Sequence, residues 1–445
     1  MRIPVALLVA AVVGSAPHAT ANEVCEAMAT DCRAKLLALI NTEMIGLDAG
    51  MEEITDTVLA DAIIARHQAH VPVRLIVEPR RTKPEPRNGP ILDKLKAAGI
   101  PMRYRAVGDI VHWKTMIFAG QNTVEFGAAQ FTTSYLIPVS ANVNFTQDPI
   151  LFSTDATVVH SFQRKFDDAW VDTVSFANYA NASTVSRAYP FYDIDPALNF
   201  VPAENFFTRS KPLYDAEKTG IDVIMYKITV AGHADSLIRA VRRGVPVRLI
   251  TEPTLYRRKD NVWQAYYLDK MYAAGVKIRD RAHLGFLHQK TTLLYSQNRT
   301  VFGSSNWTAA SNATQYEHNY FSIDPVFFGW FRDIFVRKWS SAETMAFVPL
   351  PPDPPVYVSP LDAAAGQTTT VVLSWKPGPW AHRADVYLST SSPPALYLRD
   401  VSLSPNSTKK LTISGLLAGT TYYWKIVSKT MAGQTATGPV WSFGT

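Results

Sequence analysis

The sequence predicts an α/β protein in which two similar lobes precede an all-β sandwich. Three observations predict this architecture: an internal repeat, alternating strand and helix patterns inside each copy, and a change of composition after Trp339. The chain has 445 residues, of which 47% are hydrophobic and 18% charged. This composition excludes a disordered chain and supports sizeable cores.

The internal repeat is visible as matching segments in the same order. VPVRLIVEP at 71–79 recurs as VPVRLITEP at 245–253, 174 positions later. Shorter matches follow at an offset of 176: Leu92-Asp93-Lys94 with 268–270, Ala97-Ala98-Gly99 with 273–275, Phe126-Gly127 with Phe302-Gly303, and Asp148-Pro149 with Asp324-Pro325. Because order and spacing both persist, we expect two copies of one lobe, at 22–185 and 186–345.

Each copy alternates between strand and helix patterns. In the second copy, strand patterns lie at 223–228, 245–251, 276–278, 290–295 and 300–302, and helix patterns at 236–243 and 263–274. Gly244 and Gly275 follow the two helix patterns and predict their ends. Such alternation is typical of a sheet covered by helices on its faces.

The amino-acid composition changes after the second copy of the repeat. Five prolines between 349 and 355 predict a stiff linker at 346–356. Beyond it, short segments rich in Thr, Ser and Val predict strands at 370–375, 384–388, 410–413 and 422–427. Turn residues separate these segments at a spacing typical of a β-sandwich, so we expect an all-β domain at 357–445.

The first 21 residues have the pattern of a secretory signal peptide. Arg2 precedes an apolar stretch at 5–13, and Ala19-Thr20-Ala21 forms a small-residue cleavage site. The stretch is too short to span a bilayer, so we expect a secreted protein, either extracellular or periplasmic. Cys25 and Cys32 are then expected to form a disulfide, with two buried thiols as the alternative.

The distribution of charge limits the function. The net charge is +6, of which +4 belongs to 357–445, so the chain is not a uniformly basic nucleic-acid scaffold. Local patches could still bind phosphate. No second pair of Cys or His residues has the spacing of metal ligands, and we expect neither metal nor cofactor.

Two short motifs lie in register with the repeat. His112-Trp113-Lys114 and His288-Gln289-Lys290 are 176 positions apart. In a strand, residues i and i+2 point to the same face, so each His projects together with its Lys. Fourteen residues after each Lys comes a small-residue segment, GAAQ at 127–130 and GSSN at 303–306.

These motifs resemble the phospholipase D superfamily of phosphodiesterases over residues 35–345. The resemblance implies that the two lobes face each other across a pseudo-two-fold axis with one site between them, so a second chain is not required. One His would attack phosphorus and form a phosphohistidine, and the other would protonate the leaving oxygen. Lys114, Lys290 and Asn306 would stabilise the charge that develops on the phosphate oxygens, without a metal ion.

The sequence departs from the family pattern in several places. The family Asp is replaced by Ala119 and Tyr295, and Gln130 stands where Asn is expected. At the repeat offset, Ala141 lies opposite Glu317. Because a Glu at this position would orient the His ring, we expect Glu317 to hold His288 as the nucleophile, with His112 as the acid. The swapped assignment stays open.

Further residues are candidates for substrate binding. Ser304, Ser305 and Gln130 belong to the small-residue segments, although the serines could instead close a tight turn. Two loops are predicted to form a basic rim, with two solvated charge clusters as the alternative; their residues are Arg80, Arg81, Lys83, Arg87, Arg257, Arg258 and Lys259. Arg257 is the rim residue predicted to contact the substrate.

The C-terminal segment resembles a fibronectin type III domain over 357–445. The resemblance is carried by Trp375 on an early strand, LLAGTTYYW at 416–424 and WSF at 441–443. It implies a β-sandwich that binds or spaces, with an unidentified ligand. We expect Trp380 and Trp424 to pack in its core.

The sequence favours a secreted phospholipase D-type enzyme that hydrolyses phospholipids or transfers the phosphatidyl group, in contact with a membrane surface. The first alternative is a metal-independent, non-specific endonuclease that uses the same His and Lys residues. The second alternative is a catalytically inactive binding protein, because both family Asp positions are lost.

Overall fold

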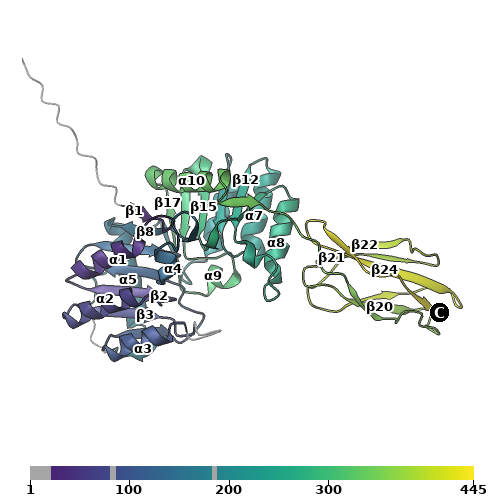
Figure 1. Cartoon of the computed structure of the whole chain (residues 1–445), viewed down its shortest axis with the longest axis horizontal. Helices are drawn as coiled ribbons and strands as arrows, with labels where there is room; N and C mark the ends of the chain where they lie inside the picture. Colours follow the sequence, from purple (N-terminus) through teal and green to yellow (C-terminus); the bar gives the residue numbers. More distant parts are fainter. Residues whose placement is uncertain (1–21, 81–86, 183–187) are drawn as a thin grey trace, which may run out of the picture.

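The computed structural model describes residues 22–80, 87–182 and 188–445, which form two α/β lobes followed by a β-sandwich (Figure 1). The predicted signal peptide at 1–21 lies outside these residues, as do Arg81 and Lys83 of the predicted rim. In the described part of the chain, no helix has the length and apolar character needed to cross a membrane.

The first lobe is built on an eight-stranded sheet in the order β1-β8-β6-β5-β2-β3-β4-β9. β2, β3 and β4 run parallel, and the other neighbours are antiparallel. The strands are β1 (Asn22–Cys25), β2 (Leu47–Met51), β3 (Val73–Val77), β4 (Met102–Arg105), β5 (Lys114–Phe118), β6 (Thr123–Gly127), β8 (Ile150–Ser153) and β9 (Phe176–Ala180). The helices are α1 (Cys32–Thr42), α2 (Thr57–Gln68), α3 (Gly89–Ala97), α4 (Thr133–Leu136) and α5 (Ala156–Val171).

The second lobe repeats this order position by position, as β10-β17-β16-β15-β11-β12-β13-β18. Its strands are β10 (Leu198–Val201), β11 (Ile221–Met225), β12 (Val247–Thr251), β13 (Lys277–Arg281), β15 (Lys290–Leu294), β16 (Arg299–Gly303), β17 (Glu317–Ser322) and β18 (Thr344–Ala346). Its helices are α6 (Phe206–Ala216), α7 (Ala231–Arg242), α8 (Val262–Ala273), α9 (Ala309–Ala313) and α10 (Pro325–Ser340), with 3-10 turns η1 (Pro253–Leu255) and η2 (Tyr295–Gln297). The prediction of two copies of one α/β lobe is confirmed.

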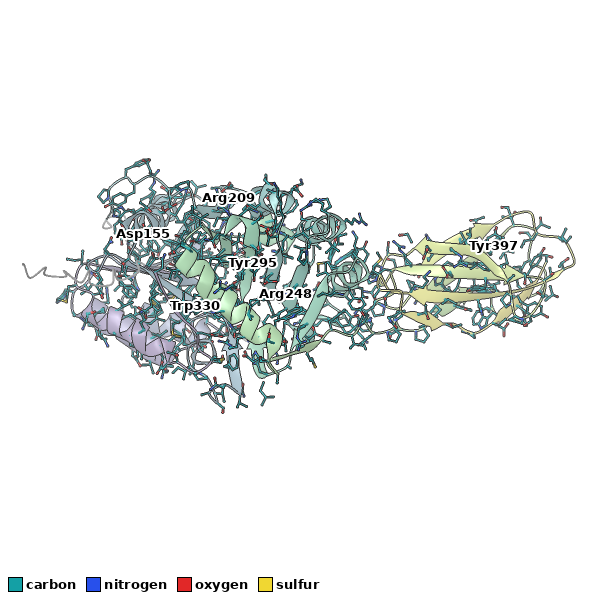
Figure 2. All side chains as sticks on the ribbon, turned by 90° about the horizontal axis from the view of Figure 1, so that it is seen from above. Asp155, Arg209, Arg248, Tyr295, Trp330 and Tyr397 are labelled. Carbon is teal, nitrogen blue, oxygen red and sulfur yellow. A yellow bond between two sulfur atoms is a disulfide. The ribbon has the colours of Figure 1, made fainter. Side chains whose placement is uncertain are left out.

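One ion pair occurs at the same register in both sheets. Arg74 on β3 binds Asp48 on β2, with Nε 2.8 Å from Oδ1, and Arg248 on β12 binds Asp222 on β11, with Nη2 2.6 Å from Oδ2. In the second lobe Tyr295 also donates to Asp222. Figure 2 shows Arg248 and Tyr295 close to α10, which carries Trp330. The repeated pair ties neighbouring parallel strands together at the center of each sheet.

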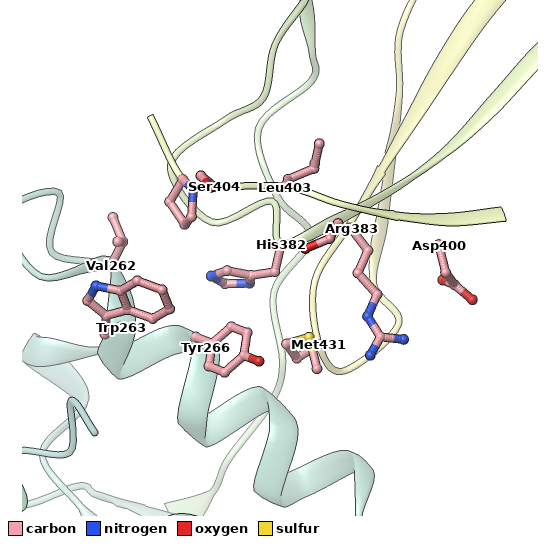
Figure 3. Close-up of a pocket in the computed structure, with 11 residues that line it drawn as sticks. Val262, Trp263, Tyr266, His382, Arg383, Asp400, Leu403, Ser404 and Met431 are labelled. Atoms are coloured by element: carbon pink, nitrogen blue, oxygen red, sulfur yellow. The ribbon is translucent and has the colours of Figure 1, made fainter. Parts of the chain in front are cut away.

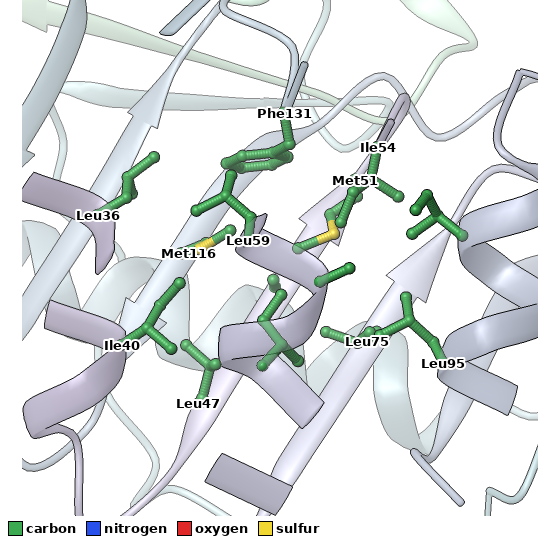
Figure 4. Packing of buried hydrophobic residues seen from close by; sticks show 14 of the residues in the cluster. Leu36, Ile40, Leu47, Met51, Ile54, Leu59, Leu75, Leu95, Met116 and Phe131 are labelled. Carbon is green, nitrogen blue, oxygen red and sulfur yellow. The ribbon is translucent and has the colours of Figure 1, made fainter. Parts of the chain in front are cut away.

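Buried side chains divide the lobes into layers. α1, α2 and α3 cover the outer face of the first sheet, where Leu36, Leu59 and Leu95 pack against strand residues (Figure 4). α6, α7 and α8 cover the outer face of the second sheet in the same way. α5 and α10 share one apolar cluster with residues of both sheets, including Phe126 and Phe302. The two lobes therefore share a common core.

One of the repeat matches does not correspond to structurally equivalent residues. Asp324 accepts hydrogen bonds from the first backbone N–H groups of α10, and its structural counterpart is Asp155, which caps α5 in the same way. The match of Asp148-Pro149 with Asp324-Pro325 is therefore wrong, because the first lobe has gained residues ahead of this point. Gly244 and Gly275 do follow helices as predicted, with φ of 85° and 99°.

The C-terminal part is a β-sandwich, as predicted, and Figure 1 shows it at the far end of the second lobe. One sheet has the order β19-β20-β23; in the other, β22-β21-β24-β25, β26 also pairs with β24. The strands are β19 (Val356–Ser359), β20 (Val371–Lys376), β21 (Arg383–Ser389), β22 (Leu396–Ser402), β23 (Lys409–Ile413), β24 (Thr421–Lys429), β25 (Thr435–Thr437) and β26 (Trp441–Gly444). Trp375 and Trp424 are buried in its core. Its assignment to the fibronectin type III class stays a prediction.

Two further predictions concern particular side chains. Cys25 and Cys32 form a disulfide, which ties β1 to the start of α1. Trp380 is buried, but it packs with the core of the second lobe and not with that of the sandwich. The prediction that Trp380 is a sandwich core residue is therefore wrong, because the sandwich docks on the lobe at this position.

Candidate active site

The two His-x-Lys motifs lie where β5 and β15 begin, at equivalent places in the two sheets. Trp113 and Gln289 point into the protein and are fully buried, so each His shares a face with its Lys, as predicted. Lys114 Nζ donates to the His112 carbonyl at 2.8 Å, and Lys290 Nζ donates to the His288 carbonyl at 2.5 Å. Each Lys therefore lies directly beside its own His.

Two short backbone contacts bring the lobes together next to these motifs. β14 (Leu284–Leu287) pairs with β7 (Asn144–Gln147) of the other lobe, and Val111 forms a bridge with Tyr316. The N–H of His288 donates to the Gln147 carbonyl at 3.0 Å, and the N–H of His112 donates to the Tyr316 carbonyl at 2.9 Å. Both histidines are thus fixed at the lobe interface, and both line one pocket of about 760 Å³.

The residue that follows each of these two carbonyl groups, Asp148 after Gln147 and Glu317 after Tyr316, orients one imidazole ring. His288 Nδ1 lies 2.7 Å from Asp148 Oδ2, and His112 Nδ1 lies 2.7 Å from Glu317 Oε2. Each lobe therefore supplies the acid for the other lobe's histidine. The prediction that Glu317 orients His288 is wrong: Glu317 orients His112, and Asp148 orients His288.

A difference in loop length hid Asp148 from the repeat. Gly127 pairs with Ile150, and Gly303 pairs with Asn319. Asp148 and Glu317 therefore each lie two residues before the strand residue that pairs with the equivalent glycine. Asp148 comes 21 residues after Gly127, whereas Glu317 comes 14 after Gly303, so a fixed offset points to Ala141 instead. The strand register is the signal that aligns the two acids.

Glu52 is a second site residue that the sequence did not reveal. It distinguishes the first half of the site, around His112 and Lys114, from the second half, around His288 and Lys290. Its Oε2 lies 2.5 Å from Lys114 Nζ, 3.2 Å from His112 Nε2 and 2.6 Å from Gln130 Nε2. It follows β2 directly, and the equivalent residue after β11 is Tyr226, whose ring contacts His288 and Lys290. The first half thus contains two buried carboxylates, Glu317 and Glu52, where the second half has Asp148 and the ring of Tyr226.

Glutamates of the repeated segment hold the loops in front of the histidines. The N–H of Val111 donates to Glu78 Oε2, and the N–H of Leu287 donates to Glu252 Oε2, both at 2.9 Å. Arg80 and Arg281 form ion pairs with these two glutamates. The glutamates of the two EP dipeptides therefore place the residue that precedes each catalytic candidate.

The small-residue segments divide into pocket and supporting residues. Gln130 and Asn306 line the pocket, as expected from their equivalent positions, and Asn306 Oδ1 has no hydrogen-bond partner within the protein. Ser304 and Ser305 are buried; Ser304 Oγ donates to Glu317, and Ser305 Oγ accepts from Asn319. The prediction that these serines bind substrate is wrong, because both hydroxyl groups are used to fix neighbouring side chains.

The predicted basic rim is only partly present. Arg87 and Arg258 line the pocket, and each has an acidic partner, Glu53 and Asp260. The guanidinium of Arg257 instead donates to the Leu350 carbonyl at the junction with the sandwich. The prediction that Arg257 binds substrate is therefore wrong, because its guanidinium is engaged in contacts at the junction with the sandwich. Arg80 is likewise engaged, by Glu78.

Burial changes the pKa values of the titratable groups in the second half of the site. It lowers the pKa of His288 well below its usual value, and the neighbouring Lys290 and Lys114 lower it further. Burial also lowers the pKa of Lys290 to about 7 and raises the pKa of Asp148 to about 7. His288 is therefore a neutral imidazole near neutral pH, the form that can act as a nucleophile.

In the first half, a carboxylate lies beside each ring nitrogen of the histidine. Carboxylate oxygens face both ring nitrogens of His112, Glu317 at Nδ1 and Glu52 at Nε2. The described residues contain no group of three or more His, Cys, Asp or Glu side chains arranged to hold a metal ion.

The two-lobe fold agrees with known proteins. The family model described as "Cardiolipin synthase, PLD-like domain" matches residues 38–170 and 213–339, more than half of the chain. The chain belongs to this PLD-like family. The matched residues therefore lie in both lobes and leave the sandwich outside.

Solved structures support the same fold. Phosphatidylserine synthase from Haemophilus influenzae Rd KW20 is 10% identical, with a TM-score of 0.58 over 73% of this chain and 87% of that one. Polyphosphate kinase from Porphyromonas gingivalis is 14% identical, with a TM-score of 0.51 over 74% of this chain and 48% of the kinase. The chain thus spans about half of that kinase. A search of curated proteins finds no match.

Proposed function

We propose that this PLD-like protein is a secreted phosphodiesterase that cleaves phospholipids, by hydrolysis or by transfer of the phosphatidyl group to another alcohol. The observation that carries the proposal is the meeting of His112 and His288 in one pocket, each with its own Lys and an acid from the opposite lobe. Aromatic residues among the lining, such as Tyr226 and Phe286, suit an amphiphilic substrate better than a bare anion site would.

The first half of the reaction forms a covalent intermediate. His288 Nδ1 is bound to Asp148, so Nε2, which lies 3.0 Å from Lys290 Nζ, is the nitrogen that would attack phosphorus. A bond forms between Nε2 and phosphorus while the bond from phosphorus to the leaving oxygen breaks, and His112 Nε2 gives its proton to that oxygen. Lys290, Lys114 and Asn306 stabilise the charge on the phosphate oxygens during this step.

The second half releases the phosphate group. His112, now neutral, takes a proton from water, whose oxygen attacks phosphorus as the bond to His288 breaks. The products are phosphatidate and the regenerated neutral His288, and an alcohol in place of water gives a new phosphodiester. Asp148 stabilises the positive charge that His288 carries while it is bound to phosphorus.

Two substrate assays test the proposal directly. Purified protein is incubated with phosphatidylcholine micelles and, separately, with supercoiled plasmid, both with a chelator present. Release of choline that is lost in His288→Ala supports the lipid reaction. Nicking of plasmid without choline release supports the endonuclease alternative, and the absence of both activities supports the inactive binding protein.

Secretion is a separate part of the proposal. The disulfide between Cys25 and Cys32 suits an oxidising compartment, as does the signal pattern at 1–21. N-terminal sequencing of the protein recovered outside the cytoplasm should begin at Asn22. An intact Met1 on that protein would contradict cleavage.

A further inference from the structure

A second cleft lies between the second lobe and the β-sandwich. Its volume is about 630 Å³, and the residues around it come from α8 on one side and from the sandwich on the other (Figure 3). Trp263 lines both this cleft and the active-site pocket. The two cavities are therefore neighbours that share the side chain of Trp263 as a wall.

Packed contacts hold the two walls of the cleft together. Trp380 of the sandwich is buried with core residues of the second lobe. The Arg257 guanidinium lies 4.7 Å from the ring centroid of Tyr256 and 4.9 Å from that of Trp380. Tyr266 on α8 meets His382 of the sandwich edge to face, with ring centroids 4.9 Å apart. The sandwich is therefore a docked wall of the cleft.

His382 is the unusual residue in this wall. It is only 3% exposed, and neither Nδ1 nor Nε2 has a hydrogen-bond partner within the protein. Figure 3 shows its ring lying opposite Trp263 and Tyr266. Burial lowers the pKa of His382 to about 4, so the ring is neutral and offers one donor and one acceptor. Leaving both unpaired is unfavourable, so a polar group that enters the cleft would be bound by them.

The chemistry of the lining narrows the class of ligand. A hydroxyl group both donates and accepts, and so satisfies either nitrogen of a neutral imidazole, whereas a phosphate diester oxygen can only accept. The described lining residues include one cation, Arg383, and one carboxylate, Asp400. A polyanionic strand would need an excess of positive charge that this lining does not provide. Trp263 is 45% exposed and offers a flat apolar face beside these polar groups.

We propose that the cleft holds a sugar or polyol head group of the substrate while the phosphodiester lies between His112 and His288. The inference rests on the proposed function, because it names the class of head group that the enzyme would select. It also gives the β-sandwich a role, since His382 and Arg383 belong to the sandwich and Trp263 to the lobe.

Head-group selectivity tests the proposal in the full-length protein. Rates are compared for phosphatidylinositol and phosphatidylcholine of equal acyl length in mixed micelles. His382→Phe keeps a ring and removes both nitrogens, and we expect the ratio of kcat/KM for phosphatidylinositol to that for phosphatidylcholine to fall about tenfold. Tyr397→Phe, on exposed strand β22, is the matched control and should leave the ratio unchanged (Figure 2). An unchanged ratio in His382→Phe overturns the proposal.

A second variant distinguishes a loss of head-group selectivity from a loss of folding. Ser404 is exposed at the edge of the cleft, so Ser404→Trp should fill the cleft without disturbing the core. We expect the same fall in the ratio, with a thermal unfolding temperature equal to that of the unaltered protein. A ratio that stays unchanged in a folded Ser404→Trp protein contradicts binding in this cleft.

Direct binding separates this proposal from the proposed function. Glycerophosphoinositol is titrated into His288→Ala protein by calorimetry, with and without His382→Phe. Binding that depends on His382, in a protein whose unaltered form cleaves no lipid, supports the cleft and overturns the proposed function. Lipid cleavage without such binding overturns the cleft and leaves the function standing. Binding of a thymidine dinucleotide in place of glycerophosphoinositol, again dependent on His382, overturns the polyol class.

Discussion

Asp148 in the first lobe orients His288 in the second, with Oδ2 2.7 Å from the ring Nδ1. Glu317 in the second lobe orients His112 in the first at the same distance. Each half of the site is thus built from both lobes, because the acid at each histidine Nδ1 comes from the opposite lobe. The activity proposed above therefore depends on the interface between the lobes.

Replacing an orienting acid should slow the chemistry and leave binding unchanged. In Asp148→Asn the amide cannot stabilise the positive charge on His288, and we expect kcat to fall about tenfold to a hundredfold with KM unchanged. Glu317→Gln should act in the same way through His112. Steady-state kinetics with bis(4-nitrophenyl) phosphate measure both effects.

Ala141 provides the control for this prediction, because the fixed repeat offset points to it. It is exposed, and Ala141→Val should leave kcat unchanged. Full activity in Asp148→Asn would show that the cross-lobe contact has no role in the reaction.

Glu52 should weaken the binding of anions. It is only 1% exposed and shares its Oε2 among Lys114, His112 and Gln130. In Glu52→Gln the inhibition constant of inorganic phosphate should fall about tenfold, because a competing negative charge is removed. The free energy of unfolding should fall by about 3–5 kcal/mol, because buried Lys114 loses its carboxylate partner.

Thermal unfolding with and without phosphate checks both parts of this prediction. Added phosphate should raise the unfolding temperature of Glu52→Gln more than that of the unaltered protein. An equal effect of phosphate on the two proteins would mean that Glu52 does not compete with the ligand.

The pKa of Lys290 predicts that kcat/KM depends on pH. Burial lowers its pKa to about 7, so the ammonium is present below this pH and is lost as the pH rises through it. Since the charge is needed at the phosphate oxygens, kcat/KM should fall above about pH 7. An arginine stays charged throughout this range, so Lys290→Arg should move the fall to higher pH at a lower maximum rate. A pH profile of kcat/KM that is identical in the two proteins would assign the fall to another group.

Arg257 should matter for the sandwich and not for catalysis. Arg257→Ala removes the cation between Tyr256 and Trp380, so the sandwich should dock less firmly. We expect faster cleavage of the 346–356 segment by an added protease and an unchanged kcat/KM for bis(4-nitrophenyl) phosphate. A large loss of activity on this small diester would restore a substrate-binding role for Arg257.

The sequence is sufficient to predict the elements that repeat. The offset of 176 aligns His112 with His288 and Gln130 with Asn306, and the structure places each pair equivalently around one pocket. Several boundaries of the second lobe are also close to prediction: the helix expected at 263–274 is α8 (Val262–Ala273), whereas the helix expected at 236–243 begins earlier, as α7 (Ala231–Arg242). Local periodicity and glycine positions are enough for these features.

The sequence could not show what depends on contacts between distant segments. Seven additional residues between Gly127 and Asp148 break the offset, so the partner of His288 is visible only through strand register. Glu52 follows a buried strand and resembles any loop acid until Lys114 is placed beside it. Arg257 resembles a free surface cation because the docking of the sandwich leaves no local pattern.

The most direct test of the proposed reaction is to identify the residue that becomes covalently attached to the substrate. His112→Ala protein reacts with bis(4-nitrophenyl) phosphate, whose leaving group needs no acid, and it is quenched in alkali before peptide mass spectrometry. We expect a 4-nitrophenyl phosphate adduct on His288, which accumulates because His112 is absent to activate water. A protein that turns over this substrate with no adduct on His288, or an adduct on His112 in the His288→Ala protein, would contradict it.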